Sequence, residues 1–357
     1  MPTPVFVSDA HLAHDGLIEL VRGREIACFE SPERAVEIER ALASADGYVF
    51  EPPTQHGVEP ITAVHDPELI DLLEHVWTDA LASEGFDAGR PLLPDTFATG
   101  GFLAGHRPDG QPASRLDRLG RYCFDTATPI VAGTYRAARA AVDVALSAAD
   151  RVLEGSPLAF GLCRPPGHHA GPNMFGGYCY LNNAAIVAQS LVAGGASRVA
   201  ILDVDYHHGN GTQQIFWDRP DVLYLSLHGD PSGAYPYFSG YASELGGGAG
   251  EGFNRNFPLP PRTDVDGYVA ALTTALRLIT DFDPDAPLVL SLGLDTFERD
   301  PISDLALRTA DYERVGAAIG ELGRPVVALQ EGGYAIDAIG ANAVSFLDGL
   351  RRGLRAA

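Results

Sequence analysis

Apolar runs of strand length alternate with stretches of helical periodicity from residue 136 to the end of the chain. The apolar runs are bounded by Gly, Pro and polar residues, which is typical of buried strands, whereas the stretches between them repeat apolar positions every three to four residues. Repeated alternation of this kind predicts a mostly parallel sheet with helices on both faces. The expected strands are 157–163, 198–203, 222–228, 287–293 and 325–330, and the expected helices are 136–153, 182–193, 268–281 and 336–352.

The first 130 residues follow this pattern less regularly. Segments 31–44 and 66–83 have helical character, but residues 85–120 are rich in Gly, Pro, Arg and Asp and show no periodicity. A segment of this kind inside a compact domain is usually a functional loop or is disordered. Because no internal repeat and no linker divides the chain, we expect residues 1–357 to form a single domain with a loop insertion at about 85–120.

Polar clusters follow four of the expected strands. They lie at residues 164–170, 203–213, 291–295 and 330–334. The carboxyl ends of parallel strands lie at one edge of a sheet, where ligands bind in open α/β folds, so residues far apart in the sequence are expected to meet there. The sequence therefore predicts one active site built from four segments.

Asp205 and His207 stand two residues apart, directly after the strand that ends at Asp203. In extended chain their side chains point the same way, and a carboxylate with an imidazole suits a divalent metal such as Zn²⁺. A hydrolytic zinc site needs three protein ligands and an open position for water, and Asp295 is the natural third ligand. Fe²⁺ and Co²⁺ suit the same residues. Alternatively, Asp203 and Asp205 only cap the following helix, and Asp295 is a turn residue.

His168 and His169 are adjacent, which disfavours their binding one metal but allows them to flank its site. A histidine with a pKa near neutrality can take a proton from water and give one to a leaving amine. Tyr334, beside two glycines, can donate a hydrogen bond to a carbonyl oxygen that becomes an oxyanion. Asp203 and Asn210 are the expected acceptors for the two imidazoles, and the uncharged asparagine should leave its histidine less basic.

Charge and composition narrow the class of function. The net charge of −22 opposes binding to nucleic acid, whose phosphates would be repelled, and suits a cationic substrate, although acidity also serves solubility alone. No basic stretch followed by an apolar one opens the chain, and no apolar run reaches membrane-spanning length. The four cysteines show no close pairing, which favours reduced thiols in a cytoplasmic protein.

Several motifs together resemble the zinc-dependent deacetylase family, which includes histone deacetylases, bacterial acetylpolyamine amidohydrolases and related acyl-amide hydrolases. The motifs are ordered along most of the chain, at 164–170, 177–183, 203–213, 226–228, 294–295 and 331–334. The resemblance implies the arginase/deacetylase fold, a single α/β domain with an eight-stranded, mostly parallel sheet. It also implies roles for individual residues: Asp205, His207 and Asp295 as zinc ligands, His169 as general base and acid, His168 as its electrostatic partner beside Asp203, and Tyr334 as the residue that polarises the scissile carbonyl.

The same resemblance implies a structural monovalent cation, usually potassium. Its expected ligands are Asp203, the backbone carbonyls of Asp205 and His207, Ser226 and Leu227. Asn210, where other members carry an aspartate, resembles the polyamine-hydrolase and class II branches of the family.

Segments 121–130 and 228–238 resemble acetylpolyamine amidohydrolases, which implies a small cationic acetylated amine as the substrate. In those enzymes the loop before residue 121 helps to form a homodimer and narrows the entrance, so the 85–120 loop is the expected dimer contact. Tyr178 and Tyr235 are candidates for the walls of the substrate tunnel, with Gly177 and Gly333 beside them. Aromatic walls favour an alkylammonium chain through cation–π contact.

The sequence departs from the polyamine-selective members of the family at the residues expected to bind the distal ammonium of the substrate. Polyamine-selective members place glutamates on the entrance loop, whereas residues 85–120 of this chain contain aspartates and no glutamate. The alternative function is a deacylase acting on acyl-lysine in proteins or on another small amide. A two-manganese ureohydrolase would need further aspartates and histidines beside Asp295, and a non-catalytic binding module would lack a metal ligand, His169 or Tyr334; the sequence has neither pattern.

Overall fold

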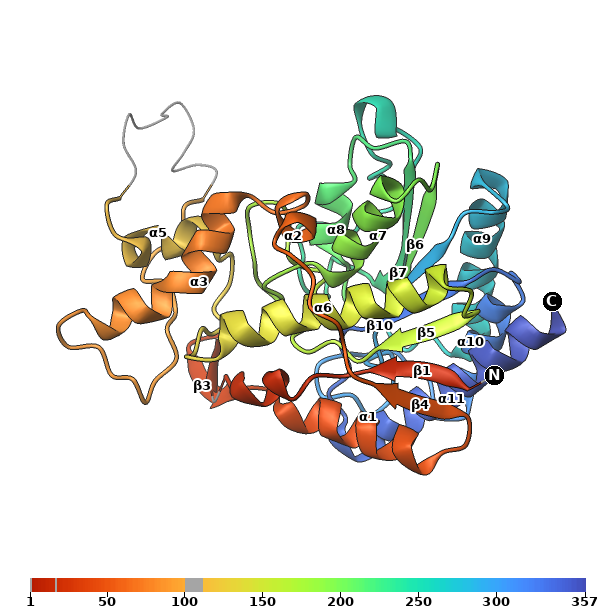
Figure 1. The fold of residues 1–357 in the computed structure, drawn as a ribbon, viewed down its shortest axis with the longest axis horizontal. Coiled ribbons are helices and arrows are strands. Elements are labelled where there is room, and N and C mark those ends of the chain that lie inside the picture. The colour runs from red at the N-terminus through yellow and green to blue at the C-terminus, as the bar shows by residue number, and fades with distance from the viewer. Residues whose placement is uncertain (1, 17, 100–111) are drawn as a thin grey trace.

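An eight-stranded parallel sheet forms the centre of the molecule (Figure 1). The computed structural model describes residues 2–16, 18–99 and 112–357. All neighbouring strands of the sheet run parallel, in the order β4, β1, β5, β10, β9, β6, β7, β8, which confirms the expected architecture. The strands are β1 (Thr3–Phe6), β4 (Tyr48–Glu51), β5 (Leu158–Gly161), β6 (Val199–Asp203), β7 (Val222–Gly229), β8 (Asn254–Leu259), β9 (Leu288–Leu292) and β10 (Val326–Gln330).

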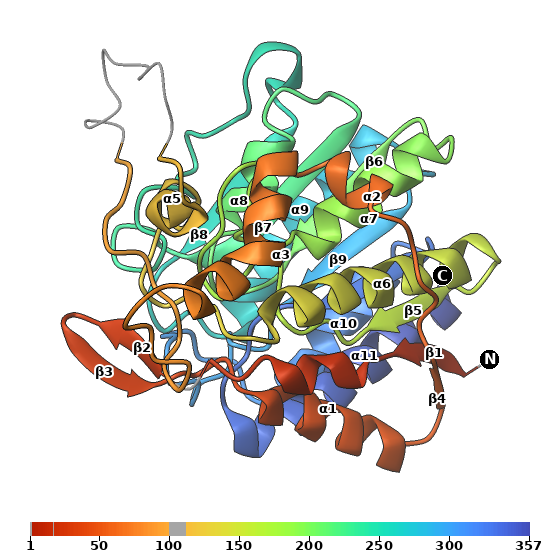
Figure 2. The ribbon, with the colours of Figure 1, turned by 60° about the vertical axis from the view of Figure 1, so that its left-hand side comes forward.

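Buried side chains on the two faces of the sheet form two separate cores. Along β10, Val326 and Ala328 pack in one core and Val327 and Leu329 in the other, because successive strand residues point to opposite faces. Helices cover both faces, so both are excluded from water, as the continuous apolar strands require (Figures 1 and 2). The helices α1 (Pro32–Ser44), α9 (Val265–Phe282), α10 (Asp311–Gly320) and α11 (Ile336–Ala356) contribute to the first core, and α3 (Pro67–Leu81), α6 (Thr134–Leu153) and α7 (Asn183–Ala193) to the second.

Shorter elements lie in the connections. They are α2 (Glu59–Thr62), α5 (Arg115–Tyr122), α8 (Asn210–Ile215), two 3-10 helices at Asp9–Ala13 and Gly248–Gly250, and the antiparallel hairpin β2 (Ile18–Val21) with β3 (Arg24–Ala27). The hairpin stands apart from the main sheet (Figure 2). None of the helices in the described ranges is long and apolar enough to cross a membrane.

The strands and helices expected after residue 136 are all present, but several elements were missed. The sequence analysis did not predict β1, β4, β8 or α10. It was also wrong to expect no regular structure up to residue 120, because α5 begins at Arg115. That helix buries Leu119 and Tyr122 in the second core, and the Arg115 guanidinium at its start lies 2.8 Å from Asp71 and 2.9 Å from Asp79, both on α3. Residues 100–111 of the same segment lie outside the described residues.

The order of the strands brings the four polar clusters together. The strands that precede them, β5, β10, β9 and β6, are direct neighbours in the middle of the sheet. Asp203 at the end of β6 pairs in register with Ser291 on one side and with Ser226 of β7 on the other. The expectation that these clusters meet at one edge of the sheet is therefore confirmed.

Candidate active site

Asp205, His207 and Asp295 converge just beyond the ends of β6 and β9. The Nδ1 atom of His207 lies 3.3 Å from Asp205 Oδ1 and 3.1 Å from Asp295 Oδ2. Ligand atoms of the three residues lie within 4.8 Å of one another, and all three residues are buried. The extended backbone expected here is wrong, since residues 205–207 form a bend. The N–H groups of Tyr206 and His207 donate to Asp295 Oδ1 and Asp205 Oδ1, each at 2.8 Å, and so orient both carboxylates.

The charges of these three residues favour a bound cation. Burial by itself would lower the pKa of His207, but hydrogen bonds to Asp205 and Asp295 outweigh burial and raise this pKa to about 10. Burial and the charge of Asp205 raise the pKa of Asp295 to about 6. A proton on His207 Nδ1 thus stands between two carboxylate oxygens, at the place a divalent cation would take. Because two carboxylates and one imidazole suit Zn²⁺, the residues fit the expected metal.

His168 and His169 have different partners and therefore different protonation states. His168 Nδ1 donates to Asp203 Oδ2 at 3.0 Å, and His169 Nδ1 donates to Asn210 Oδ1 at 2.7 Å, so both expected acceptors are in place. Burial acts to lower the pKa of His168, but the charges of Asp205 and Asp203 raise it to about 10. Burial and the positive charge of His168 hold the pKa of His169 well below its usual range. The pair combines a charged imidazole with a neutral one that can accept a proton.

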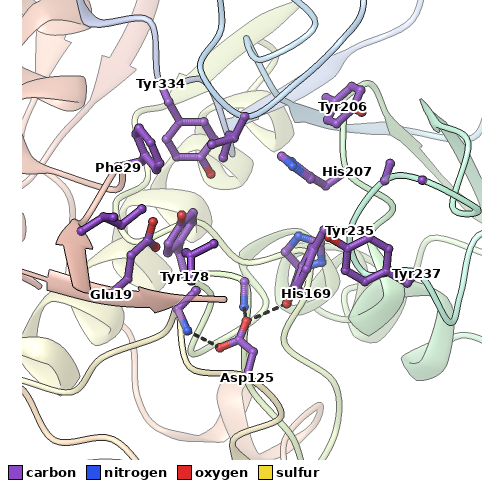
Figure 3. Close-up of a pocket in the computed structure, with 17 residues that line it drawn as sticks. Glu19, Phe29, Asp125, His169, Tyr178, Tyr206, His207, Tyr235, Tyr237 and Tyr334 are labelled. Carbon is purple, nitrogen blue, oxygen red and sulfur yellow. Dashed lines mark hydrogen bonds between the residues drawn. The ribbon is translucent and has the colours of Figure 1, made fainter. Parts of the chain in front are cut away.

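Tyr334 follows β10 and turns its ring towards a cavity beside His207 and His169 (Figure 3). Burial raises the pKa of its hydroxyl well above the usual range, so the hydroxyl stays protonated and can donate a hydrogen bond. Gly333 lies behind this tyrosine and is not one of the residues that line the cavity, contrary to the expectation. Its φ of +117° suits glycine, and a Cβ there would lie 2.8 Å from the Cβ of Leu294.

His169 and Tyr334 line a cavity of about 260 Å³. Small-molecule sites usually measure about 300–1,000 Å³, so this cavity suits a slender ligand. Tyr178 and Tyr235 also line it, as expected (Figure 3). Gly177 is a further lining residue, also as expected. A Cβ on Gly177 would lie 2.2 Å from His169 Cδ2, so a side chain at this position would displace the imidazole.

The outer part of the cavity includes residues that the sequence analysis did not single out. The β2–β3 hairpin contributes Glu19, Val21 and Ile26. Glu19 is 1% exposed, and its Oε2 has no hydrogen-bond partner within the described part of the chain. Burial raises the pKa of Glu19 to about 7, although a hydrogen bond with Tyr178 acts against this. The sequence signal was one acidic residue inside an otherwise apolar run at 18–21, which is weak evidence by itself.

Asp125, a second residue missed from the sequence, joins three loops of the cavity wall (Figure 3). Its Oδ2 accepts hydrogen bonds from the Gly177 N–H and the Tyr235 hydroxyl, both at 2.7 Å, and its Oδ1 accepts one from the Ala127 N–H at 3.1 Å. Tyr235 packs edge-on against His169, with 5.1 Å between the ring centroids. Asp125 thereby holds one wall of the cavity against the imidazole.

Glu331, known from the sequence only as part of a motif, holds the loop that carries the two histidines. Its Oε2 accepts hydrogen bonds from the N–H groups of Gly167 at 2.6 Å and His168 at 3.1 Å. Its Oε1 accepts one from the Ser291 hydroxyl at 3.1 Å. Burial raises the pKa of Glu331 to about 7. This carboxylate connects the ends of three neighbouring strands.

The residues expected around a monovalent cation lie at and just beyond the end of β6 and within the neighbouring β7. Asp203, Ser226 and Leu227 are fully buried. Asp203 Oδ1 accepts a hydrogen bond from the Asp205 N–H at 3.1 Å, and its Oδ2 accepts one from the Tyr224 hydroxyl at 2.9 Å. Buried oxygens of this kind are the donors that hard cations prefer.

Comparison with known proteins places these features in one family. The chain matches the histone deacetylase domain over residues 28–350. It is 48% identical to acetylpolyamine amidohydrolase 1 of Pseudomonas aeruginosa over 343 residues, covering 96% of this chain and 97% of that protein. It is 42% identical to the acetylpolyamine amidohydrolase of Mycoplana ramosa over 346 residues, covering 97% and 99%. The crystal structure of the acetylpolyamine aminohydrolase from Burkholderia pseudomallei is similar with a TM-score of 0.91 at 40% identity, covering 98% of this chain and 99% of that one. The chain therefore belongs to the histone deacetylase family.

Proposed function

We propose that this chain hydrolyses the amide bond of acetylated polyamines or short acetylated diamines and releases acetate and the free amine. One observation carries the proposal: the buried carboxylate of Glu19, with an unpartnered oxygen, lines the same cavity as His169 and Tyr334. A buried polar group without a partner is unfavourable, and an alkylammonium group is a partner that would satisfy it. Relatives with the name acetylpolyamine amidohydrolase support the same substrate class.

Asp205, His207 and Asp295 would hold the metal in this proposal, and their donor atoms suit Zn²⁺. A zinc ion at this position supplies Lewis acidity towards the substrate carbonyl and lowers the pKa of water. The protein contributes two carboxylates whose orientation is fixed by backbone N–H groups before any substrate arrives.

His169 moves the protons of the reaction. Its neutral imidazole accepts a proton from the attacking water and later donates it to the leaving amine nitrogen as the C–N bond breaks. Asn210 engages Nδ1 of His169, which leaves Nε2 as the proton acceptor. His168, kept charged beside Asp203, stabilises the negative charge that develops during attack. The Tyr334 hydroxyl donates a hydrogen bond to the carbonyl oxygen as it gains charge.

Two aromatic walls orient the substrate chain. Tyr178 and Tyr235 lie on opposite sides of the cavity, and Glu19 lies beside Tyr178 (Figure 3). A methylene chain packs between the rings, and its ammonium group gains a cation–π contact and an ion pair with the carboxylate.

A monovalent cation, expected to be potassium, belongs to the proposal as a structural support. Asp203, Ser226 and Leu227, with the carbonyls of Asp205 and His207, would surround it. Removal of potassium should lower both the activity and the midpoint of thermal unfolding, because the same residues lie next to the metal ligands. Equal activity in potassium-free and potassium-containing buffer would contradict this assignment.

The proposal also includes a homodimer that forms through the 85–120 segment. The described end of that segment is fixed to the body of the protein, since Arg115 bonds to Asp71 and Asp79. Light scattering should give twice the chain mass, and deletion of residues 100–111 should give the monomer mass. A monomer mass for the chain without the deletion, at micromolar concentration, would contradict the dimer.

A substrate panel with zinc-loaded enzyme tests the function. Acetylputrescine, acetylcadaverine, acetylspermidine and an acetyl-lysine peptide are compared by kcat/KM. The proposal predicts that one of the three small amines has the highest value. Preference for the peptide would instead support the protein deacylase alternative.

A further inference from the structure

We propose that Asp300 is a positioning residue for the reaction and acts by fixing the main chain of Tyr334. Asp300 lies in the connection after β9, on a different segment from Tyr334, and is buried. Its Oδ2 accepts a hydrogen bond from the Tyr334 N–H at 2.7 Å. Its Oδ1 accepts one from the Ile302 N–H at 3.1 Å, within its own loop. One carboxylate thus ties the loop after β9 to the residue that follows β10.

The peptide unit between Gly333 and Tyr334 is held at both of its polar groups. The Gly333 carbonyl accepts a hydrogen bond from Arg34 Nε at 2.6 Å, while the Tyr334 N–H donates to Asp300. Arg34 is 2% exposed and Asp300 is 7% exposed, so little water competes for either bond. The bond from the Arg34 guanidinium is charge-assisted, and such bonds are about twice as strong as neutral ones. Together with the bond to Asp300, on the opposite edge of the same peptide plane, it determines how that plane is rotated.

This peptide needs such restraint because glycines precede it. Gly332 and Gly333 have no side chains to pack, and glycine loses more conformational freedom on folding than any other residue. Gly333 also adopts a φ of +117°. The rotation of the 333–334 peptide sets the direction of the Tyr334 Cα–Cβ bond and hence the place of the hydroxyl. A shift of about 1 Å in a reacting group can cost about a hundredfold in rate.

The hydrogen bond from Ile302 gives Asp300 a second possible role, which the experiment must exclude. Asp300 could serve only the fold of its own loop, which also places Ile302 in the cavity wall. A defect in that loop would lower activity whether or not Tyr334 carries a hydroxyl. A defect in the position of Tyr334 matters only while the hydroxyl is present. The inference rests on the proposed function, which gives that hydroxyl its part in the reaction.

A double-mutant cycle separates these roles. Asp300→Asn keeps the size of the side chain but replaces one acceptor oxygen by an NH₂ group, and it is measured alone and together with Tyr334→Phe. Asp300→Ala serves as a second variant, and Asp264→Asn, a helix-capping aspartate that accepts the Gly267 N–H and does not line the cavity, is the matched control. Steady-state kinetics on acetylputrescine, bound zinc per chain and the midpoint of thermal unfolding are recorded for each.

The inference predicts that Asp300→Asn lowers kcat about tenfold with less than a twofold change in KM, and Asp300→Ala lowers it further. In the Tyr334→Phe background the same substitutions should change kcat less than twofold, with zinc content and the unfolding midpoint kept. An equal loss in both backgrounds, no loss in either, or loss of zinc in both Asp300 variants would overturn it. Full activity of Tyr334→Phe by itself would instead contradict the proposed function.

Discussion

The base and the mouth of the cavity are built in different ways. The base consists of Asp205, His207, Asp295, His168, His169 and Tyr334, and the mouth of Glu19, Val21, Ile26, Asp125, Tyr235 and Tyr237. Side chains of the base follow four neighbouring strands at the centre of the sheet, whereas those of the mouth come from a hairpin and from loops. The carboxylates and imidazoles of the base have partners within the site, whereas Glu19 at the mouth keeps one unpartnered oxygen.

This difference separates two properties of the enzyme. A sheet edge fixes geometry, which the chemical step requires, and loops on a rigid scaffold can vary without disturbing it. Substitutions at the base should therefore lower activity on every substrate to a similar extent. Substitutions at the mouth should change the choice among substrates.

Loss of a metal ligand should have the largest effect. Asp295→Asn weakens the three-residue metal site, and since even residues next to metal ligands contribute about 10–100-fold to affinity or activity, we expect a loss of about a thousandfold or more in kcat. Zinc per chain, measured by elemental analysis, should fall in parallel. Asp264→Asn, at a residue that does not line the cavity, is the control. If Asp295→Asn keeps full zinc content and full activity, Asp295 is not a metal ligand.

Loss of His169, the proposed proton-transfer residue, should have the next largest effect. His169→Ala should lower kcat on acetylputrescine about a hundredfold or more, as is usual for general acid–base groups, while the zinc content stays at the wild-type level. The same factor is expected for an uncharged acetylated amine. A loss confined to one substrate would place His169 in substrate recognition instead.

The protonation of Glu19 should make the substrate preference depend on pH. Its pKa of about 7 means that the carboxyl is mostly neutral at pH 6 and mostly charged at pH 8, while an alkylammonium stays charged throughout. The kcat/KM ratio of acetylputrescine to N-pentylacetamide, in which a methyl group replaces the ammonium, should rise up to about tenfold over this range. Effects on the chemical step cancel in the ratio. If this kcat/KM ratio does not change with pH in the wild type, Glu19 does not bind the ammonium group of the substrate.

The smallest effect is expected at an aromatic wall. Tyr235→Phe removes the hydroxyl that donates to Asp125 but keeps the ring against His169. One lost hydrogen bond contributes about 0.5–1.5 kcal/mol, so KM for acetylputrescine should rise about threefold while kcat changes little. A large fall in kcat would show that base and mouth are less separate than the structure indicates.

The base could be predicted from the sequence because its residues directly follow long apolar strands. Once those strands were assigned to one parallel sheet, Asp205, Asp295 and Tyr334 had to lie at one edge. The prediction that Asp203 and Asn210 accept hydrogen bonds from His168 and His169 was also correct. The backbone at residues 205–207 was not, since a bend rather than an extended strand brings Asp205 and His207 together.

The mouth could not be predicted because it depends on contacts between distant segments. The hairpin strands are four residues long and show little pattern. Glu19 reaches the cavity because its neighbour Leu20 bonds to Thr126: the Leu20 N–H donates to the Thr126 carbonyl at 3.2 Å, and the Thr126 hydroxyl donates to the Leu20 carbonyl at 2.8 Å. Asp300 could not be predicted for the same reason, since its hydrogen-bond partner Tyr334 lies 34 residues away in the sequence.

The central claim is that the base performs the reaction and the mouth selects a cationic amine. Its most direct test measures kcat/KM of the wild type and of Glu19→Gln at pH 8 on acetylputrescine and on N-pentylacetamide. We predict that the substitution lowers the value for acetylputrescine about tenfold, as expected for loss of a charged hydrogen bond, and leaves N-pentylacetamide within twofold of the wild type. An equal loss on both substrates, or no loss on either, would contradict the claim.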